Sequence, residues 1–460
     1  MLKRILYTLL FCGLIVFPLS AQVDSALQKL LSIPGLKHAA VGISVKRVKD
    51  QKIISEYRSE TALIPASVTK LFSTALSLQK VGPAYTFSTS VAYTGEIVDG
   101  ILKGDIVIEA GGDPCLDSRY FPSRRFVDTV IHVIKVLGIH QVEGTVVIRG
   151  ADKEEGIPGS WLWEDIANYY GALYHPFNYR DNLYTVTLKP ERTTGMAKIV
   201  SVIPSIEVEF INRVTVSDLK KEDVWIYGGP YAEKLLLKGN ITTKSFSYEV
   251  KGAIHHPAEI ACNELKRRLR RQGITIGDTS VSGDSLHSLH TFISPTVEEI
   301  VFYTNKRSIN LFAEALGKLV SPDRFEQEVK RRLAGMAIDT SGIILKDASG
   351  LSMQNAAPAE VFTDLLLWCR RHLGRPFWAS LPEGGVDGGL TIYADHPVLR
   401  NNLRAKTGSF TGVRTLSGFL TTRDGQELAF TILINHYTCT PKELQEAVRD
   451  FLVDMSKGSE

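Results

Sequence analysis

The sequence predicts a multidomain α/β protein in which an antiparallel sheet with a covering terminal helix is interrupted by a large β-rich insertion. Its 460 residues are 44% hydrophobic, enough for two or three domains with separate cores. Short alternating segments between residues 85 and 252 are typical of strands, whereas the segments that follow favour helices. Three alternating runs and one helical run end the chain, which is the pattern of an antiparallel meander covered by a helix.

These changes of pattern predict the domain organisation. We expect one domain from residues 22–84 and 285–460, and an inserted domain from residues 85–183 and 253–284. A second small β-rich module, residues 184–252, is nested in the insertion. The insertion therefore separates the first helix of the chain from most of its own domain.

The N-terminus has the features of a secretory signal. Two basic residues precede an apolar run from Ile5 to Phe17, and a small-residue cleavage site ends at Ala21. The run is shorter than the roughly 20 residues that a membrane-spanning helix needs. We therefore expect residues 1–21 to be removed and the mature protein to be exported, soluble or peripherally membrane-associated, without a transmembrane anchor.

Composition excludes several function classes. Without residues 1–21 the chain carries 51 basic and 50 acidic residues, a balance that does not suggest a nucleic-acid partner. His255-His256 resembles a metal pair, but Pro257 favours a helix start followed by an apolar stripe, so we expect no metal and no cofactor. The remaining cysteines lack metal-ligand spacing, and the sequence leaves open whether they form disulfides. They are Cys115, Cys262, Cys369 and Cys439.

The elements are predicted in the following order. A hairpin of residues 39–45 and 52–57 leads into a helix near Ser67 that ends at Gly82. Inside the insertion we expect strands at 87–93, 101–109, 142–148, 184–188, 198–203, 206–210 and 245–251, and helices at 126–137 and from Pro257. After it we expect helices following Ser294-Pro295 and Ser308, a helix at 359–372, strands at 403–410, 415–422 and 427–434, and a helix at 441–455.

The first of these helices begins with a chemically suggestive motif, Ser67-Val68-Thr69-Lys70. Three residues on, Lys70 lies about one turn along the helix, on nearly the same face as the Ser67 hydroxyl. Burial and the helix N-terminus would both lower the pKa of the lysine, and a serine needs such a base to become a nucleophile. A helix start with a solvated lysine would show the same four residues, so the motif is weak by itself.

Two further motifs follow the Ser67 motif along the chain, and the order of the three is informative. Ser308-Ile309-Asn310 stands at a second helix start, and Lys406-Thr407-Gly408-Ser409 lies on a predicted strand near the C-terminus. Together with Ser67-x-x-Lys70 they resemble the penicilloyl-serine transferases, the superfamily of penicillin-binding proteins and serine β-lactamases. This resemblance implies a β-lactamase/transpeptidase-like domain, an antiparallel sheet with helices on both faces.

The number of residues between the first two motifs indicates which class of this superfamily the sequence resembles. Ser67 and Ser308 are 241 residues apart, which is similar to the class C low-molecular-mass penicillin-binding proteins, the D-alanyl-D-alanine carboxypeptidase/endopeptidases of the penicillin-binding protein 4 type. The sequence departs from the family pattern at Ala348, where glycine is more usual, and at Gly389, where threonine is commoner. Other matches run along nearly the whole mature chain, at Gly111 to Pro114, Pro158 to Trp161, Tyr170 to Ala172, Asp347 to Ser352 and Val386 to Gly388.

The resemblance implies roles for the first two motifs. Ser67 would attack the carbonyl of a terminal D-Ala-D-Ala bond, and Lys70 would take its proton as an acyl-enzyme forms. Ser308, between the two lysines, would relay a proton to the leaving amine. Asn310 would hold an amide oxygen of the substrate.

The third motif is expected to bind the substrate. Lys406 and Thr407 would face the free carboxylate of the terminal D-Ala, and Gly408 would let the strand lie close to the substrate. The backbone amides of Ser67 and Ser409 would form the oxyanion hole. Glu154 or Glu155, just before Pro158, could meet an amino group on the peptide side chain, although an exposed surface position explains them more simply.

The function implied is a periplasmic serine peptidase that trims or opens peptidoglycan. Its partners would be peptidoglycan stem peptides and cross-links, and β-lactam antibiotics would be covalent inhibitors. Two alternatives remain open from the sequence: a β-lactamase, and a wall-binding or β-lactam-sensing module without hydrolytic activity. We find no class A-type carboxylate motif between Asn310 and Lys406 to activate water, so a penicilloyl adduct is expected to be long-lived.

Overall fold

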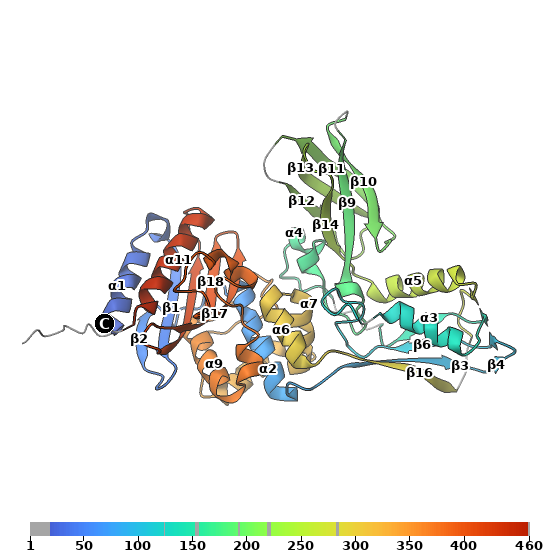
Figure 1. Cartoon of the computed structure of the whole chain (residues 1–460), viewed down its shortest axis with the longest axis horizontal. Coiled ribbons are helices and arrows are strands. Elements are labelled where there is room, and N and C mark those ends of the chain that lie inside the picture. The colour runs from blue at the N-terminus through green and yellow to red at the C-terminus, as the bar shows by residue number, and fades with distance from the viewer. Residues whose placement is uncertain are drawn as a thin grey trace, which may run out of the picture.

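The computed structural model describes residues 19–123, 125–151, 156–191, 194–218, 222–281 and 285–458. Figure 1 shows a layered α/β domain that holds both ends of the described chain, and an insertion that extends away from it. The insertion consists of a lower unit of sheets and helices and an upper module built mainly of strands. This architecture agrees with the predicted fold class, an α/β domain with a large β-rich insertion.

The layered domain is built on a five-stranded antiparallel sheet of order β17-β18-β19-β1-β2. Its strands are β1 (Ala40–Arg47), β2 (Ile53–Tyr57), β17 (Leu403–Phe410), β18 (Val413–Thr421) and β19 (Glu427–Asn435). The predicted hairpin and the predicted meander are both present. They join edge to edge through β1 and β19, which brings the two ends of the sequence into one sheet.

Helices cover both faces of this sheet, as the family resemblance implied. Alternate residues of β19 divide between two cores, because successive side chains of a strand point to opposite faces. Phe430 and Ile432 pack with α1 (Leu19–Leu31) and α11 (Pro441–Ser456), whereas Ala429 and Leu433 pack with α9 (Ala359–His372). The α9 layer continues into α2 (Lys70–Val81), α6 (Val297–Arg307), α7 (Asn310–Val320), α8 (Phe325–Ala334) and α10 (Arg375–Trp378).

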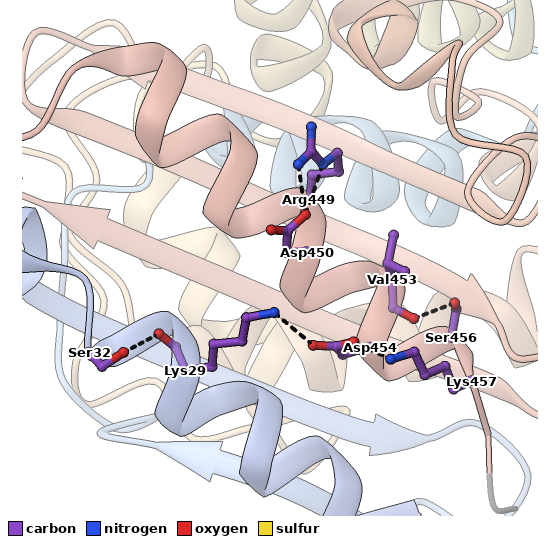
Figure 2. A network of polar contacts seen from close by, with 8 residues as sticks. All are labelled: Lys29, Ser32, Arg449, Asp450, Val453, Asp454, Ser456 and Lys457. Carbon is purple, nitrogen blue, oxygen red and sulfur yellow. Dashed lines mark hydrogen bonds and ion pairs between the residues drawn. The ribbon is translucent and has the colours of Figure 1, made fainter.

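Helix α1 was not predicted, and it is held mainly by its apolar side. Val23, Leu27 and Leu30 are buried in the core that α11 covers. Figure 2 shows the charged contacts beside this packing, where Lys29 Nζ lies 3.7 Å from Asp454 Oδ2. Such exposed pairs contribute little, so the buried side chains account for most of the attachment. The expected cleavage point after Ala21 falls within α1, and the described core side chains begin beyond it.

The lower unit of the insertion contains two four-stranded sheets, of order β16-β3-β6-β8 and β15-β7-β5-β4. Two amphipathic helices, α3 (Phe126–Val136) and α5 (Pro257–Arg271), bury their apolar sides against these sheets. The strands are β3 (Ser88–Thr94), β4 (Ile97–Val98), β5 (Ile101–Leu102), β6 (Ile106–Glu109), β7 (Gln141–Val142), β8 (Val146–Arg149), β15 (Thr275–Ile276) and β16 (Leu286–Ile293).

The second boundary of the insertion lies further along the chain than expected. We expected the layered domain to resume at residue 285, but β16 pairs antiparallel with β3 and so belongs to the insertion. Most β16 side chains are exposed or half-buried and only Phe292 is buried, so the strand lacks the alternation that marks a core strand. The chain returns to the layered domain at Ser294, whose hydroxyl accepts a hydrogen bond of 2.8 Å from the Phe87 amide.

The upper module is one six-stranded sheet of order β12-β13-β11-β10-β9-β14. Its strands are β9 (Leu183–Glu191), β10 (Met196–Ile203), β11 (Glu209–Ser217), β12 (Asp223–Tyr227), β13 (Lys234–Thr242) and β14 (Tyr248–Ala253). The sequence analysis missed β12 and β13. β13 opens with three consecutive leucines rather than an alternating pattern, and its parallel pairing with β11 is not a local feature of the sequence.

Short helical turns complete the chain. They are η1 (Pro34–Leu36), η2 (Ala66–Thr69), α4 (Trp163–Ile166), η3 (Tyr169–Gly171), η4 (Arg180–Asn182) and η5 (Gly388–Tyr393). Three of them, η2, η3 and η5, border the site described below.

Replacing Phe430 by alanine should strongly destabilise the layered domain. Phe430 is 0% exposed between the sheet and the α1/α11 layer, and truncating such a ring leaves a cavity that costs about 3–5 kcal/mol. Urea unfolding measures this loss. Lys442→Ala on the exposed side of α11 is the control, and it should change the unfolding free energy by less than about 0.5 kcal/mol. Equal midpoints for the two variants would contradict this packing.

Candidate active site

The three motifs meet around one cavity of about 350 Å³. Ser67 comes from η2 and Ser308 from the junction of α6 and α7. Lys406 comes from β17, an edge strand of the five-stranded sheet. The sequence-predicted residues Ser67, Ser308, Lys406, Thr407, Gly408 and Ser409 all line this cavity. Lys70 and Asn310 lie behind it and are joined to it by hydrogen bonds.

The first motif folds differently in detail from the prediction. We expected Ser67 in the first turn of an α-helix, but residues Ala66–Thr69 form a 3-10 turn and the α-helix begins at Lys70. The Val68 amide donates to the Pro65 carbonyl at 3.1 Å, and Ala66 has a φ of 46°. Pro65 and the left-handed Ala66 therefore bend the chain tightly ahead of the helix, and Ser67 is the residue directly after this bend.

Lys70 is completely buried and makes three hydrogen bonds through Nζ. The acceptors are Ser67 Oγ at 3.1 Å, Asn310 Oδ1 at 2.6 Å and the Ser349 carbonyl at 2.6 Å. Burial lowers the pKa of Lys70 to about 7, against opposing effects of Asp347 and Glu314. A neutral amine has two N–H donors and one lone pair, so it can bond Asn310 and Ser349 while accepting the proton of Ser67.

Ser308 and Lys406 form a second pair. Ser308 ends α6 in the left-handed region, with a φ of 56°, and its hydroxyl accepts a hydrogen bond of 2.9 Å from Lys406 Nζ. Lys406 Nζ also donates to the Thr407 carbonyl at 2.6 Å. Burial and the neighbouring Lys70 hold the pKa of Lys406 well below that of a free lysine. The site thus contains two buried amines, each bonded to a serine hydroxyl.

Asn310 is already engaged on both sides of its amide. Its Oδ1 accepts from Lys70, and its Nδ2 donates at 2.7 Å to the carbonyl of Tyr170, which lies on η3 of the insertion. One N–H of Nδ2 remains for the substrate contact that we expected, and that contact stays a prediction. The insertion therefore reaches the catalytic motifs directly.

Gly408 allows β17 to lie against the η2 turn. A Cβ at this position would stand 2.8 Å from the Ser67 amide nitrogen and 2.3 Å from Thr415 Oγ1. Thr415 in turn donates at 2.8 Å to the Pro65 carbonyl, which ties the sheet to the same turn. Gly389 is a position at which the sequence departs from the pattern expected from the resemblance. A Cβ added to Gly389 would lie 2.5 Å from Thr407 Oγ1. A larger residue at 389 would require Thr407 to move.

Two carboxylates lie behind Lys70: Glu314, which the sequence did not single out, and Asp347, which lies in a matched stretch but had no predicted role. The Trp161 indole, also in a matched stretch without a predicted role, bonds Asp347. Asp347 accepts hydrogen bonds from the Gly350 amide at 2.7 Å and from Trp161 Nε1 of the insertion at 2.8 Å. Glu314 accepts from the Ser349 amide at 2.8 Å. One signal was available: Glu314 is the one acid in the otherwise apolar first half of α7, four residues after Asn310.

The comparisons with known proteins agree with this geometry. The profile of the D-Ala-D-Ala carboxypeptidase 3 (S13) family matches residues 19–455. The chain belongs to this family. It is accordingly a serine-type D-Ala-D-Ala carboxypeptidase, a peptidoglycan hydrolase of the penicillin-binding class, as the three motifs predicted.

Individual relatives match over most of their length. D-alanyl-D-alanine carboxypeptidase DacB of Haemophilus influenzae is 23% identical over 86% of this chain and 86% of its own. A D-alanyl-D-alanine carboxypeptidase of Actinomadura sp. is 26% identical over 91% of this chain and 82% of its own. The crystal structure of penicillin binding protein 4 from H. influenzae superposes with a TM-score of 0.79 at 22% identity, covering 94% of this chain and 98% of that one. It confirms the predicted β-lactamase/transpeptidase-like fold with its β-rich insertion.

The other predicted features have these outcomes. Across the described ranges no helix is long and apolar enough to cross a membrane, and no cluster of three or more His, Cys, Asp or Glu side chains could hold a metal. Cys262, Cys369 and Cys439 are free thiols. Glu154 and Glu155 lie outside the described residues.

Gly408→Ala should lower kcat/KM for D-Ala release by about 100-fold or more. The new methyl group would press on the Ser67 amide and on Thr415, and displacements of about 1 Å at a reacting group have effects of that size. Gly229→Ala is the matched control, because a Cβ there meets no atom within 4 Å. Release of D-Ala from an N-acyl-D-Ala-D-Ala peptide measures both variants, and a near-normal rate for Gly408→Ala would contradict the close approach of β17 to η2.

Proposed function

We propose that the enzyme cleaves the D-Ala-D-Ala termini and cross-links of peptidoglycan stem peptides through an acyl-enzyme on Ser67, and that β-lactams acylate the same serine. The observation that carries this proposal is the buried Lys70 amine, 3.1 Å from the Ser67 hydroxyl. A structure of H. influenzae penicillin binding protein 4 in complex with a β-lactam supports the second part.

In the acylation step, Ser67 Oγ attacks the carbonyl carbon of the penultimate D-Ala and its proton passes to Lys70. Asn310 and the Ser349 carbonyl hold the amine so that its lone pair faces Ser67. This arrangement fixes the base before substrate arrives, so little reorganisation is needed in the transition state. Lys70 can serve as this base at neutral pH because burial disfavours its charged form.

The developing oxyanion would be bound by the backbone amides of Ser67 and Ser409. The bare Cα of Gly408 lets β17 lie close to the η2 turn, which supports the proposal that both amides serve one oxygen. Such donors typically contribute several kcal/mol to the transition state.

Protonation of the leaving group would fall to Ser308. Its hydroxyl is bonded to Lys406, which in turn would face the free carboxylate of the terminal D-Ala together with Thr407. Because burial lowers the pKa of Lys406, an incoming carboxylate would favour the charged ammonium form of this lysine. Lys406 would take the added proton from solvent and stay charged on the substrate carboxylate. Ser308 would pass its own proton to the leaving amine and receive the one that Lys70 took from Ser67, so the relay is balanced.

Export to the periplasm completes the proposal. Peptidoglycan is the polymer that presents D-Ala-D-Ala, and the N-terminal apolar run with its small-residue site would direct the chain there. The insertion, which contacts the site through Tyr170 and Trp161, would form one wall of the channel for the stem peptide.

Ser67→Ala should reduce D-Ala release by about 1,000-fold or more and should abolish the penicillin adduct, because the nucleophile is lost. Intact-mass spectrometry of penicillin-treated protein and a digest of muropeptides measure the two effects. Ser77→Ala is the matched control, since Ser77 is a buried serine on α2, the helix that follows η2, and its hydroxyl donates to the Thr74 carbonyl. Retention of full activity in Ser67→Ala would refute the proposed nucleophile.

The acylation rate should rise with pH and reach half its maximum near pH 7. Only neutral Lys70 can accept the serine proton, and its pKa of about 7 means that the charged form predominates below that value. Below pH 7 the rate should therefore fall about tenfold per unit. Stopped-flow acylation by a fluorescent penicillin between about pH 5 and pH 9 tests this, and a flat profile would contradict Lys70 as the base.

A further inference from the structure

Glu314 accepts a hydrogen bond from the amide of Ser349, the residue whose carbonyl accepts from Lys70. It lies on α7 one turn beyond Asn310, and one carboxylate oxygen accepts from the Ser349 amide at 2.8 Å. Both oxygens accept from the Ala348 amide at 3.2 Å. The carbonyl of Ser349 accepts from Lys70 Nζ at 2.6 Å, so the position of this loop decides where the amine points.

Among the charged groups of the described chain that act on Glu314, Lys70 is the one cation, and the others are either negative or already paired. From the elements packed against it, α2 contributes Lys70 and the 347–352 loop contributes Asp347. On α6 Lys306 pairs with Asp387, and on α8 Lys330 pairs with Glu326, while Lys406 faces Lys70 from β17. Within the described ranges Glu314 has no salt bridge of its own. Burial and then the charge of Asp347 raise the pKa of Glu314 to about 7.

We propose that Glu314 is a positioning residue for Lys70: it fixes the Ser349 carbonyl on the amine, and its negative charge adds to that of Asp347 in raising the pH at which the amine becomes a base. The inference rests on the proposed roles of Ser67 and Lys70. It adds a residue outside the three motifs, four positions after Asn310 on α7.

The two parts of this role can be separated. Glutamine keeps one oxygen that can accept from the Ala348 and Ser349 amides, replaces the second acceptor on Ala348 by an NH2 group and removes the charge, so it tests mainly the electrostatic part. Aspartate keeps the charge but is one methylene shorter, so it tests the hold on the loop. Glu326→Gln is the matched control, because Glu326 also accepts from a loop amide, that of Leu345 at 3.0 Å, but lies on α8 beside Lys330.

The readout is the rate of penicillin acylation against pH, followed by intact mass. Glu314→Gln should move the half-maximal pH down by about one unit while leaving the alkaline plateau within about threefold of wild type, since a carboxylate near a lysine raises its pKa by this order. Glu314→Asp should leave the half-maximal pH in place and lower the plateau about tenfold or more, because a loosened loop misplaces the base. Glu326→Gln should follow the wild-type curve.

Several outcomes would overturn the inference. An unchanged half-maximal pH in folded Glu314→Gln would show that the residue is only structural. Normal acylation, with loss of the penicilloyl adduct at least about tenfold slower than in wild type, would instead make Glu314 a base for the hydrolytic water. If Glu314→Gln does not fold, as judged by thermal unfolding, the Glu314→Asp plateau decides, and a wild-type plateau there refutes the hold on the loop. Failure of wild type itself to form any adduct would refute the proposed function rather than the role of Glu314.

Discussion

The burial of the Lys70 amine is the constraint on which the rest of the site depends. A buried ammonium is costly unless it is paired, and here the cost appears as a lowered pKa rather than as a salt bridge. The three acceptors around Nζ come from η2, α7 and the 347–352 loop. Each of these segments must be held in place, so a single buried amine dictates how three parts of the layered domain meet.

The insertion takes part in holding them. The Tyr170 carbonyl fixes Asn310, and the Trp161 indole fixes Asp347 at the start of the loop that presents Ser349. Two of the three acceptors of Lys70 are therefore supported by residues of the inserted polypeptide, which lies far from them in sequence. Through these two contacts the insertion is part of the structure that supports the active site.

The close contact between β17 and the η2 turn is the second requirement. The bare Cα of Gly408 and the Thr415 hydroxyl bring the edge strand β17 within contact distance of the Ser67 backbone. The sheet order places β17 at this edge because β1 and β19 pair in its interior, so the N-terminal hairpin positions the C-terminal motif. The sheet and the helical layer are thus joined at the reacting serine itself.

The sequence by itself determined the three motifs and their order, and these carry the resemblance to the family. It also determined most strands and helices, because they follow from local hydrophobic periodicity. It could not place β16, β12 and β13, whose pairing partners are distant or whose faces are mostly exposed. It also could not reveal Glu314, Asp347 and Trp161 behind Lys70. Only the tertiary structure decides which charges share a buried space, since burial and distance across the fold, rather than spacing along the chain, set the protonation of the base.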